Sequence, residues 1–231
     1  MKKLIIGNWK ANKDEVSTSA WFEKFARLAN FDVDQVEVVV APPFNLLSIA
    51  RQKIDELALP IKLAVQDLSP MPTGSYTGEV AAGNLHGLRV EYAILGHSER
   101  RRYFLETDHL IANKVEMACL ANIKPVLCLD EPYLMTQSRA IKKELLPECV
   151  VAYEPLSAIG SGDNASISEV TSFKDRLYAV CGEVDFIYGG SVNADNVNQY
   201  LLVSRGVLVG GASLDATNFA ELIRRSVVQN E

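Results

Sequence analysis

Side chains that can take part in acid–base chemistry follow several short apolar segments of this 231-residue chain. Asn8 and Lys10 follow the apolar segment 4–6, His97 follows 92–95, and Glu154 follows 149–153. A carboxylate that ends an apolar strand is partly removed from water, which makes it a better general base. Strand periodicity places Asn8 and Lys10 on one side of the chain, where an amide and an ammonium suit an anionic substrate. Together these residues indicate proton transfer on an anion.

The immediate neighbours of His97 and Glu154 bear on that chemistry. Ser98 can cap a following helix and Glu99 favours its positive N-terminal end, so we expect a nearby His97 to be a neutral imidazole that donates a hydrogen bond. Pro155 restricts Glu154 to extended geometry, and the glycine-containing stretch 156–162 could be a mobile lid that excludes water. Taken singly, each residue also has an ordinary interpretation as a solvated lysine, a lone histidine or a glutamate in a surface turn.

Two glycine pairs follow the last two apolar segments. Gly189 and Gly190 precede Ser191, and Gly210 precedes Gly211. Glycines allow backbone N–H groups to approach an anion closely, and a phosphate site after strands 7 and 8 is typical of α/β barrels. Glycine turns without a ligand are the alternative for either pair alone. The two pairs together favour a phosphate site.

The elements that must position these side chains repeat along the chain. Eight apolar runs of strand length occur about 30 residues apart, the size of one strand–helix unit. They lie at residues 4–6, 36–41, 61–65, 92–95, 125–129, 149–153, 186–188 and 207–209. Amphipathic helical patterns lie at 16–29, 100–121, 168–180 and 217–228, and one short helix is expected at 134–145. The sequence therefore predicts a single (β/α)8 barrel domain over residues 1–231, with its active site at the carboxyl ends of the strands.

Composition excludes several other classes of protein. The chain is 48% hydrophobic and 23% charged, which is typical of a globular protein, and its net charge is −6. An acidic chain without a basic block is a poor candidate for binding nucleic acid or an anionic membrane. No apolar stretch approaches the roughly 20 residues of a membrane span, and the apolar run at the N-terminus is too short for a signal peptide. We therefore expect no nucleic acid, no membrane and a cytoplasmic location.

The cysteines and histidines also indicate a cytosolic protein without a metal site. The four cysteines form no CxxC pair and lie in or beside apolar stretches, as reduced, buried cysteines of a cytosolic protein do. The three histidines form no cluster with the spacing of metal ligands. We therefore expect no metal site.

The motifs taken in order resemble the triosephosphate isomerase family over essentially the whole chain. The matching stretches are 7–10 (Gly-Asn-Trp-Lys), 77–79 (Thr-Gly-Glu), 96–101 (Gly-His-Ser-Glu-Arg-Arg), 152–155 (Ala-Tyr-Glu-Pro), 158–160 (Ala-Ile-Gly), 188–192 (Tyr-Gly-Gly-Ser-Val) and 210–214 (Gly-Gly-Ala-Ser-Leu). No single stretch is diagnostic, but the ordered set is highly specific. The resemblance implies the interconversion of dihydroxyacetone phosphate and D-glyceraldehyde 3-phosphate, in glycolysis and gluconeogenesis, without cofactor or metal.

The resemblance also implies roles for individual residues. Glu154 would abstract a carbon-bound proton beside the carbonyl, and neutral His97 would polarise the carbonyl and shuttle protons between the two oxygens. Lys10 would stabilise the enediolate and the phosphate, with Asn8 supporting the same oxygen. Glu99 would lie near Lys10 and help to organise it. The phosphate would be held by backbone N–H groups of Gly160, Ser191, Gly210 and Gly211.

The loop from Asp67 to Gly78 is similar to the intersubunit loop of the family. The resemblance implies a homodimer in which the loop tip, residues 75–77, inserts beside the substrate-binding residues of a second copy. The alternative is an ordinary solvated loop rich in proline and glycine.

Some positions depart from the family pattern. Ser157 stands where the family usually has tryptophan, Ser161 where it has threonine, Asp163 where it has lysine and Asp130 where it has glycine, and the segment after the fifth strand is shorter than usual. We expect these changes to affect lid packing rather than the reaction.

Two other functions remain open at this point. Another barrel isomerase or epimerase acting on a sugar phosphate would need a metal cluster or a different acid–base pair, and the sequence has neither. A non-catalytic homologue that only binds phosphorylated metabolites would have no evident use for Glu154, His97 and Lys10.

Overall fold

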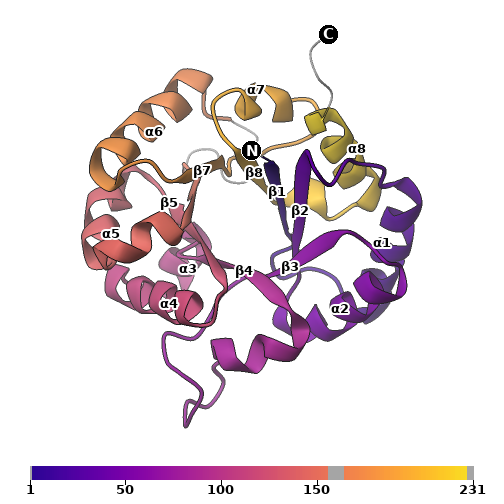
Figure 1. The fold of residues 1–231 in the computed structure, drawn as a ribbon, viewed down its shortest axis with the longest axis horizontal. Coiled ribbons are helices and arrows are strands. Elements are labelled where there is room, and N and C mark those ends of the chain that lie inside the picture. Colours follow the sequence, from indigo (N-terminus) through magenta and orange to yellow (C-terminus); the bar gives the residue numbers. More distant parts are fainter. Residues whose placement is uncertain (1, 156–163, 228–231) are drawn as a thin grey trace.

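The chain forms a closed barrel of parallel strands surrounded by helices (Figure 1). The computed structural model describes residues 2–155 and 164–227. Each strand pairs with the next strand in the sequence, and β8 closes the barrel by pairing with β1 through Leu4–Gly206 to Gly7–Val209. The predicted (β/α)8 architecture is therefore confirmed.

The strands occur at all eight places where the apolar runs predict them. Their bounds are β1 (Lys3–Asn8), β2 (Val36–Ala41), β3 (Ile61–Val65), β4 (Val90–Leu95), β5 (Lys124–Leu129), β6 (Val150–Tyr153), β7 (Asp185–Tyr188) and β8 (Gly206–Val209). The runs mark the strands well because both faces of a parallel barrel strand are covered, so every position favours an apolar side chain.

The helices agree less well with the sequence patterns. Their bounds are α1 (Glu15–Leu28), α2 (Leu47–Glu56), α3 (Ser98–Tyr103), α4 (Asp108–Leu120), α5 (Leu134–Ala140), α6 (Ile167–Cys181), α7 (Val197–Leu201) and α8 (Ala216–Val227). The single helix predicted at 100–121 is wrong: the chain leaves α3 at Phe104, and Leu105 takes a left-handed conformation (φ 57°). Thr107 then caps α4 by accepting a hydrogen bond from the backbone N–H of Leu110.

The region after β5 also differs from expectation. The helix predicted at 134–145 ends at Ala140, and a short 3-10 segment, Lys143–Glu148, follows it. Pro147 lies inside that segment and cannot continue an α-helix, because it lacks the backbone N–H. The chain therefore reaches β6 through two short helical turns.

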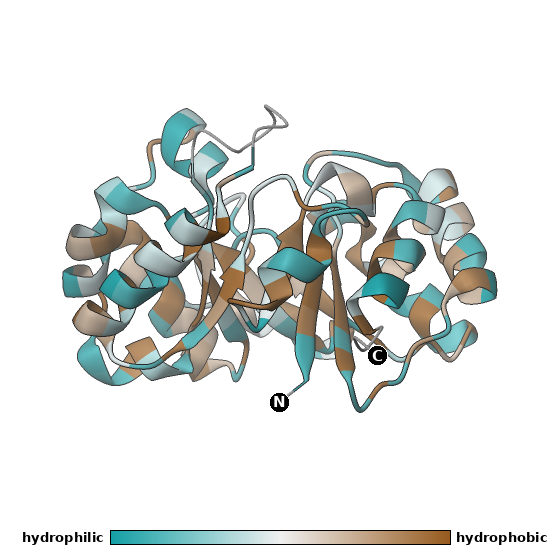
Figure 2. Cartoon of the chain, turned by 90° about the horizontal axis from the view of Figure 1, so that it is seen from above, coloured by the Kyte–Doolittle hydropathy of each residue, from teal (hydrophilic) through white to brown (hydrophobic). Residues whose placement is uncertain are grey.

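Alternate residues of each strand divide between two apolar layers, as the period of two requires. Leu4 and Ile6 belong to the cluster inside the barrel, whereas Ile5 belongs to the layer between the barrel and the helices. Figure 2 shows the hydrophobic strands in the centre and hydrophilic residues on the outer helices. Packing inside the barrel leaves its carboxyl end as the place where polar side chains can converge.

The connection between β3 and β4 contains the loop from Asp67 to Gly78 and extends beyond the ring of helices (Figure 1). Its base is closed by a hydrogen bond from the backbone N–H of Ser69 to the carbonyl of Val80, at 3.0 Å. None of the helices in the described part of the chain has the length and apolar character needed to cross a membrane.

Candidate active site

A cavity of about 410 Å³ opens at the carboxyl ends of the strands. Its volume lies in the range of small-molecule sites. The described residues that line it are Asn8, Lys10, His97, Glu154, Asn164, Gly189, Ser191, Val192, Asn193, Leu208, Gly210, Gly211 and Ala212. The sequence places most of its candidate residues at separate strand ends, and the barrel brings them to this one cavity.

Glu154 and His97 face one another in the cavity. Glu154 directly follows β6, where its backbone N–H donates to the carbonyl of Leu129 at 2.9 Å and continues the sheet. The Oε1 atom of Glu154 lies 3.4 Å from Nε2 of His97, and each residue is only 4% exposed. The other carboxylate oxygen, Oε2, is buried and has no hydrogen-bond partner among the described residues. The lone pairs of this oxygen are therefore not engaged by a hydrogen bond within the described part of the chain.

The opposite side of the His97 ring is held by the backbone. The N–H of Glu99 donates to Nδ1 of His97 at 3.2 Å, so His97, and not Ser98 as expected, caps α3. A nitrogen that accepts a hydrogen bond carries no proton. This contact therefore holds the neutral imidazole with its proton on Nε2, the nitrogen that faces the cavity and Glu154.

The charges around His97 act against that neutral form. Burial lowers the pKa of His97, but the carboxylates of Glu154 and Glu99 raise it by more, so the pKa lies above its ordinary value. The helix terminus alone predicts a neutral imidazole, but in the fold the carboxylate of Glu154 also acts on His97. The backbone hydrogen bond to Nδ1 favours the imidazole form of His97, and the two carboxylates favour the imidazolium form.

Lys10 supplies the positive charge of the cavity. Its Nζ atom lies 2.6 Å from Oε1 of Glu99, and its backbone N–H donates to Oδ1 of Asn8 at 3.0 Å. The Lys10 backbone is left-handed (φ 53°), and Gln66 donates to its carbonyl at 2.9 Å. Asn8 thus fixes the backbone of Lys10, and Glu99 fixes its ammonium group. Together the two contacts direct the Lys10 side chain at the cavity.

The glycine-containing turns form the other wall. Ser191, Gly210 and Gly211 all line the cavity, and a side chain built at Gly210 would meet the Lys10 chain at 3.7 Å. Ser191 also has a left-handed backbone (φ 48°). Gly160, the remaining candidate phosphate ligand, lies outside the described residues, as do Ser157, Ser161 and Asp163.

Gly189, which the sequence predicts only as part of a phosphate-binding turn, and Asn164, which it does not predict, also shape the site. A Cβ atom at Gly189 would lie 2.7 Å from Cγ of Glu154, so only glycine permits the carboxylate to occupy its position. Asn164 lines the cavity without belonging to any motif of the sequence. Within the described residues, no group of three or more His, Cys, Asp or Glu side chains could hold a metal ion.

A closed (β/α)8 barrel with a buried carboxylate, an imidazole and an ammonium in one cavity defines an enzyme of the proton-transferring barrel class. The sequence profile of the triosephosphate isomerase family matches residues 3–226. The chain is 37% identical to the triosephosphate isomerase of Ehrlichia chaffeensis over 98% of each chain. It is 36% identical to the triosephosphate isomerase of Leifsonia xyli subsp. xyli over 96% of each chain. It is also 36% identical to the triosephosphate isomerase of Thermus thermophilus, over 96% of this chain and 97% of the other. The chain belongs to the triosephosphate isomerase family and is an isomerase.

Proposed function

We propose that Glu154, His97 and Lys10 carry out the reaction of this family, the interconversion of dihydroxyacetone phosphate and D-glyceraldehyde 3-phosphate. The observation that supports these roles is the pairing of Glu154 and His97 at 3.4 Å, both buried in a cavity that Lys10 also lines. The general base needs an unpartnered oxygen, and the electrophile needs a proton on the nitrogen that faces the carbonyl. Oε2 of Glu154 and Nε2 of His97 meet these needs.

The reaction proceeds through an enediolate. Glu154 takes a proton from C1 of dihydroxyacetone phosphate, the C–H electron pair forms a C1=C2 double bond, and the carbonyl pair moves to O2. His97 donates its Nε2 proton to O2 and takes the O1 proton in return, so that the proton count of the imidazole is restored. Glu154 then returns its proton to C2. Lys10, held by Glu99, stabilises the negative charge that develops on the oxygens.

The phosphate group would lie against the turns after β7 and β8. Backbone N–H groups of Ser191, Gly210 and Gly211 are the donors that we assign to it, with Gly160 completing the set, and Asn8 and Lys10 would bind the rest of the substrate. Main-chain donors suit this role in a chain of net charge −6, because they attract an anion locally.

The test is a coupled assay of glyceraldehyde 3-phosphate isomerisation with Glu154→Gln. The amide cannot accept the proton, so kcat should fall by about 10²–10⁴-fold while KM changes little. Glu131→Gln is the matched control, because Glu131 follows the neighbouring strand β5 but lies exposed in a salt bridge with Arg176. A Glu154→Gln enzyme that keeps more than about a tenth of wild-type kcat would contradict the assignment, given that range.

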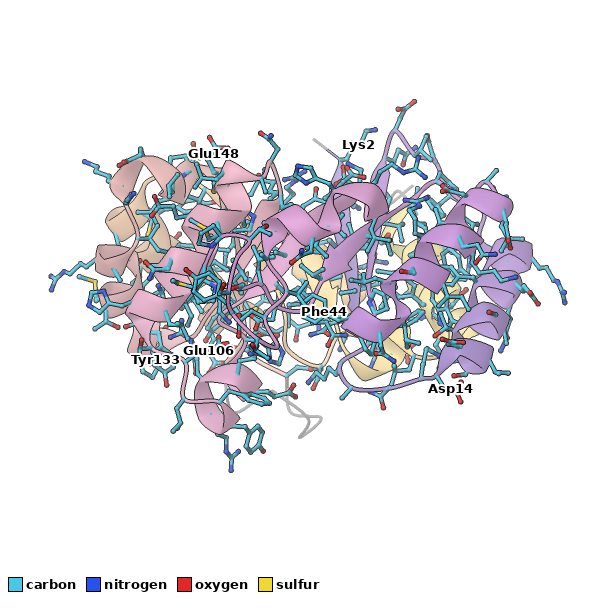
Figure 3. The ribbon with its side chains drawn as sticks, turned by 90° about the horizontal axis from the view of Figure 1, so that it is seen from below. Lys2, Asp14, Phe44, Glu106, Tyr133 and Glu148 are labelled. Carbon is cyan, nitrogen blue, oxygen red and sulfur yellow. The ribbon has the colours of Figure 1, made fainter. Side chains whose placement is uncertain are left out.

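We also propose that the enzyme is a homodimer assembled through the loop from Asp67 to Gly78. Partly or largely exposed apolar side chains follow three consecutive strands at the end of the barrel that carries the site. They are Phe44 after β2, Met71 and Tyr76 after β3, and Phe104 after β4, with exposed fractions between 37% and 65%. In Figure 3, Phe44 and Glu106 lie lower in the view than Lys2 and Glu148. Exposed apolar side chains that follow neighbouring strands are the kind of surface that a second copy of the chain can cover.

Deletion of residues 75–77 tests the dimer. The shortened protein should sediment as a monomer and lose most of its turnover. Monomers with full activity would show that the loop is dispensable.

The cytoplasm is the compartment that we propose for this reaction of glycolysis and gluconeogenesis. All four cysteines are free, and Cys128 and Cys149 are buried, which suits a reducing compartment.

A further inference from the structure

Asn164 lies at the rim of the cavity and contacts the backbone of the turn after β7. In the amide orientation that satisfies all of its polar neighbours, which is the one assigned here, the Nδ2 atom of Asn164 donates to the carbonyl oxygens of Gly190, at 3.0 Å, and Ser191, at 3.1 Å. Its Oδ1 atom accepts a hydrogen bond from Nδ2 of Asn196 at 2.9 Å, and Asn196 also donates to the Ser191 carbonyl at 3.2 Å. The two asparagines therefore hold the same carbonyl from two sides.

The position of Asn164 is itself fixed by buried groups. The hydroxyl of Tyr188 accepts a hydrogen bond from the backbone N–H of Ala165 at 3.0 Å, and the hydroxyl of Tyr200 donates to the carbonyl of Ala165 at 3.0 Å. Both tyrosines are buried, with their rings stacked 4.0 Å apart between centroids. The residue next to Asn164 is thus clamped to the barrel, so the Asn164 amide is presented from a rigid support.

Holding these carbonyls sets the direction of the N–H groups that follow them. In a trans peptide the C=O and the next N–H point in opposite directions, and no cis peptide occurs in the described chain. The contacts of Asn164 with the Gly190 and Ser191 carbonyls therefore orient the N–H groups of Ser191 and Val192, and both residues line the cavity. They also hold Ser191 in a left-handed conformation that a serine rarely adopts (φ 48°).

We propose that Asn164 is a positioning residue for the substrate phosphate. Its amide holds the Gly190 and Ser191 carbonyls and thereby presents the N–H groups of Ser191 and Val192 to the phosphate oxygens. This role rests on the proposed function, which places the phosphate at this turn. Among the described residues, the hydrogen bonds of Asn164 go to Gly190, Ser191 and Asn196 and not to Glu154 or His97, so we expect its effect at the phosphate end of the substrate.

The experiment compares Asn164→Leu with the wild-type enzyme on two substrates. Leucine nearly matches the shape of asparagine but cannot hydrogen-bond. The first substrate is D-glyceraldehyde 3-phosphate, and the second is D-glyceraldehyde, which lacks the phosphate. Binding of inorganic phosphate is measured separately by calorimetry. Asn113→Leu, at an exposed position of α4, is the matched control.

Loss of two hydrogen bonds should lower kcat/KM for D-glyceraldehyde 3-phosphate by about tenfold and weaken inorganic phosphate binding by a similar factor. The kcat/KM of Asn164→Leu for D-glyceraldehyde should equal that of the wild type, because this substrate has no phosphate to hold. Asn113→Leu should match the wild type on both substrates. An equal loss on both substrates would overturn the proposal, since a merely structural defect does not distinguish them. Unchanged kinetics with unchanged phosphate binding would overturn it too.

The calorimetry keeps this result separate from the proposed function. If the wild-type protein lacks isomerase activity, the proposed function fails, and weaker phosphate binding by Asn164→Leu still supports the role of Asn164. If the wild type is active and Asn164→Leu binds phosphate normally, only the role of Asn164 fails.

Discussion

Lys114→Met should destabilise the protein strongly, because it leaves the buried carboxylate of Glu106 and the largely buried carboxylate of Asp67 without one of their cations. Lys114 is 3% exposed, and its Nζ atom lies 2.6 Å from Oδ1 of Asp67 and 2.5 Å from Oε1 of Glu106. Arg100 completes the cluster, with contacts of 2.7 Å to each of the same two carboxylates. The cluster is neutral with two cations and two anions, and the substitution leaves it with a net charge of −1.

The size of the effect follows from burial. Breaking a buried ion pair by removing one partner costs about 3–5 kcal/mol. For a chain of 231 residues, each kcal/mol lowers the unfolding midpoint by about 2 °C, so Lys114→Met should lower it by about 6–10 °C. Lys142→Met is the matched control, because Lys142 pairs with Glu116 at the exposed surface and its loss should leave the midpoint almost unchanged. Differential scanning calorimetry of the three proteins measures the effect.

The pH dependence of the unfolding midpoint of Lys114→Met tests whether the unpaired carboxylates cause the loss of stability. Burial raises the pKa of Asp67, although Lys114 partly offsets this, so the pKa should rise further without the lysine. A carboxyl whose pKa is higher in the folded than in the unfolded protein takes up a proton on folding, and it stabilises the fold increasingly as the pH falls through that raised pKa. The difference between the unfolding midpoints of Lys114→Met and the wild type should therefore become smaller as the pH is lowered from 7. The reasoning would be refuted if the difference in unfolding midpoint between Lys114→Met and the wild type did not change with pH. It would also be refuted if Lys114→Met lowered the midpoint no more than Lys142→Met does.

Two further predictions concern single residues. In Glu154→Gln the pKa of His97 should fall, because the charge that raises it is gone, and NMR titration of the imidazole would show this; an unchanged pKa would mean that Glu154 does not set it. Leu105→Gly should raise the free energy of unfolding by about 1 kcal/mol, because glycine relieves the left-handed backbone at a side chain that is 78% exposed. Chemical denaturation checks this, and a loss of stability would indicate that Leu105 is covered in the assembled protein.

The barrel could be predicted from sequence because its signal is local. Each strand is a short run that is apolar at nearly every position, and the runs recur at the length of one strand–helix unit. The site could be located for the same reason: Glu154 and His97 each follow such a run directly, and parallel strands of a barrel bring their carboxyl ends together. Neither inference needed a contact between distant segments.

The features that sequence reasoning missed depend on such distant contacts. The Asn164 side chain acts on carbonyls 26 and 27 residues away, and nothing in its neighbours along the chain marks it. The protonation of His97 could not be judged from α3 alone, since Glu154 acts on it across 57 residues. In both cases the residue type is ordinary and only the fold gives it a role.

The break between α3 and α4 shows why the pattern at 100–121 was misleading. The turn at 104–107 folds Glu106 back onto both Arg100 and Lys114. In a continuous helix the side chains of Arg100, Glu106 and Lys114 would be too far apart to contact one another. The buried cluster can therefore form only because the helix is interrupted at 104–107. Asp67, where the proposed dimer loop begins, joins the same cluster through Arg100 of α3, the helix that His97 caps. Disturbing the cluster should therefore reach both the loop, through Asp67, and His97, through the helix that it caps.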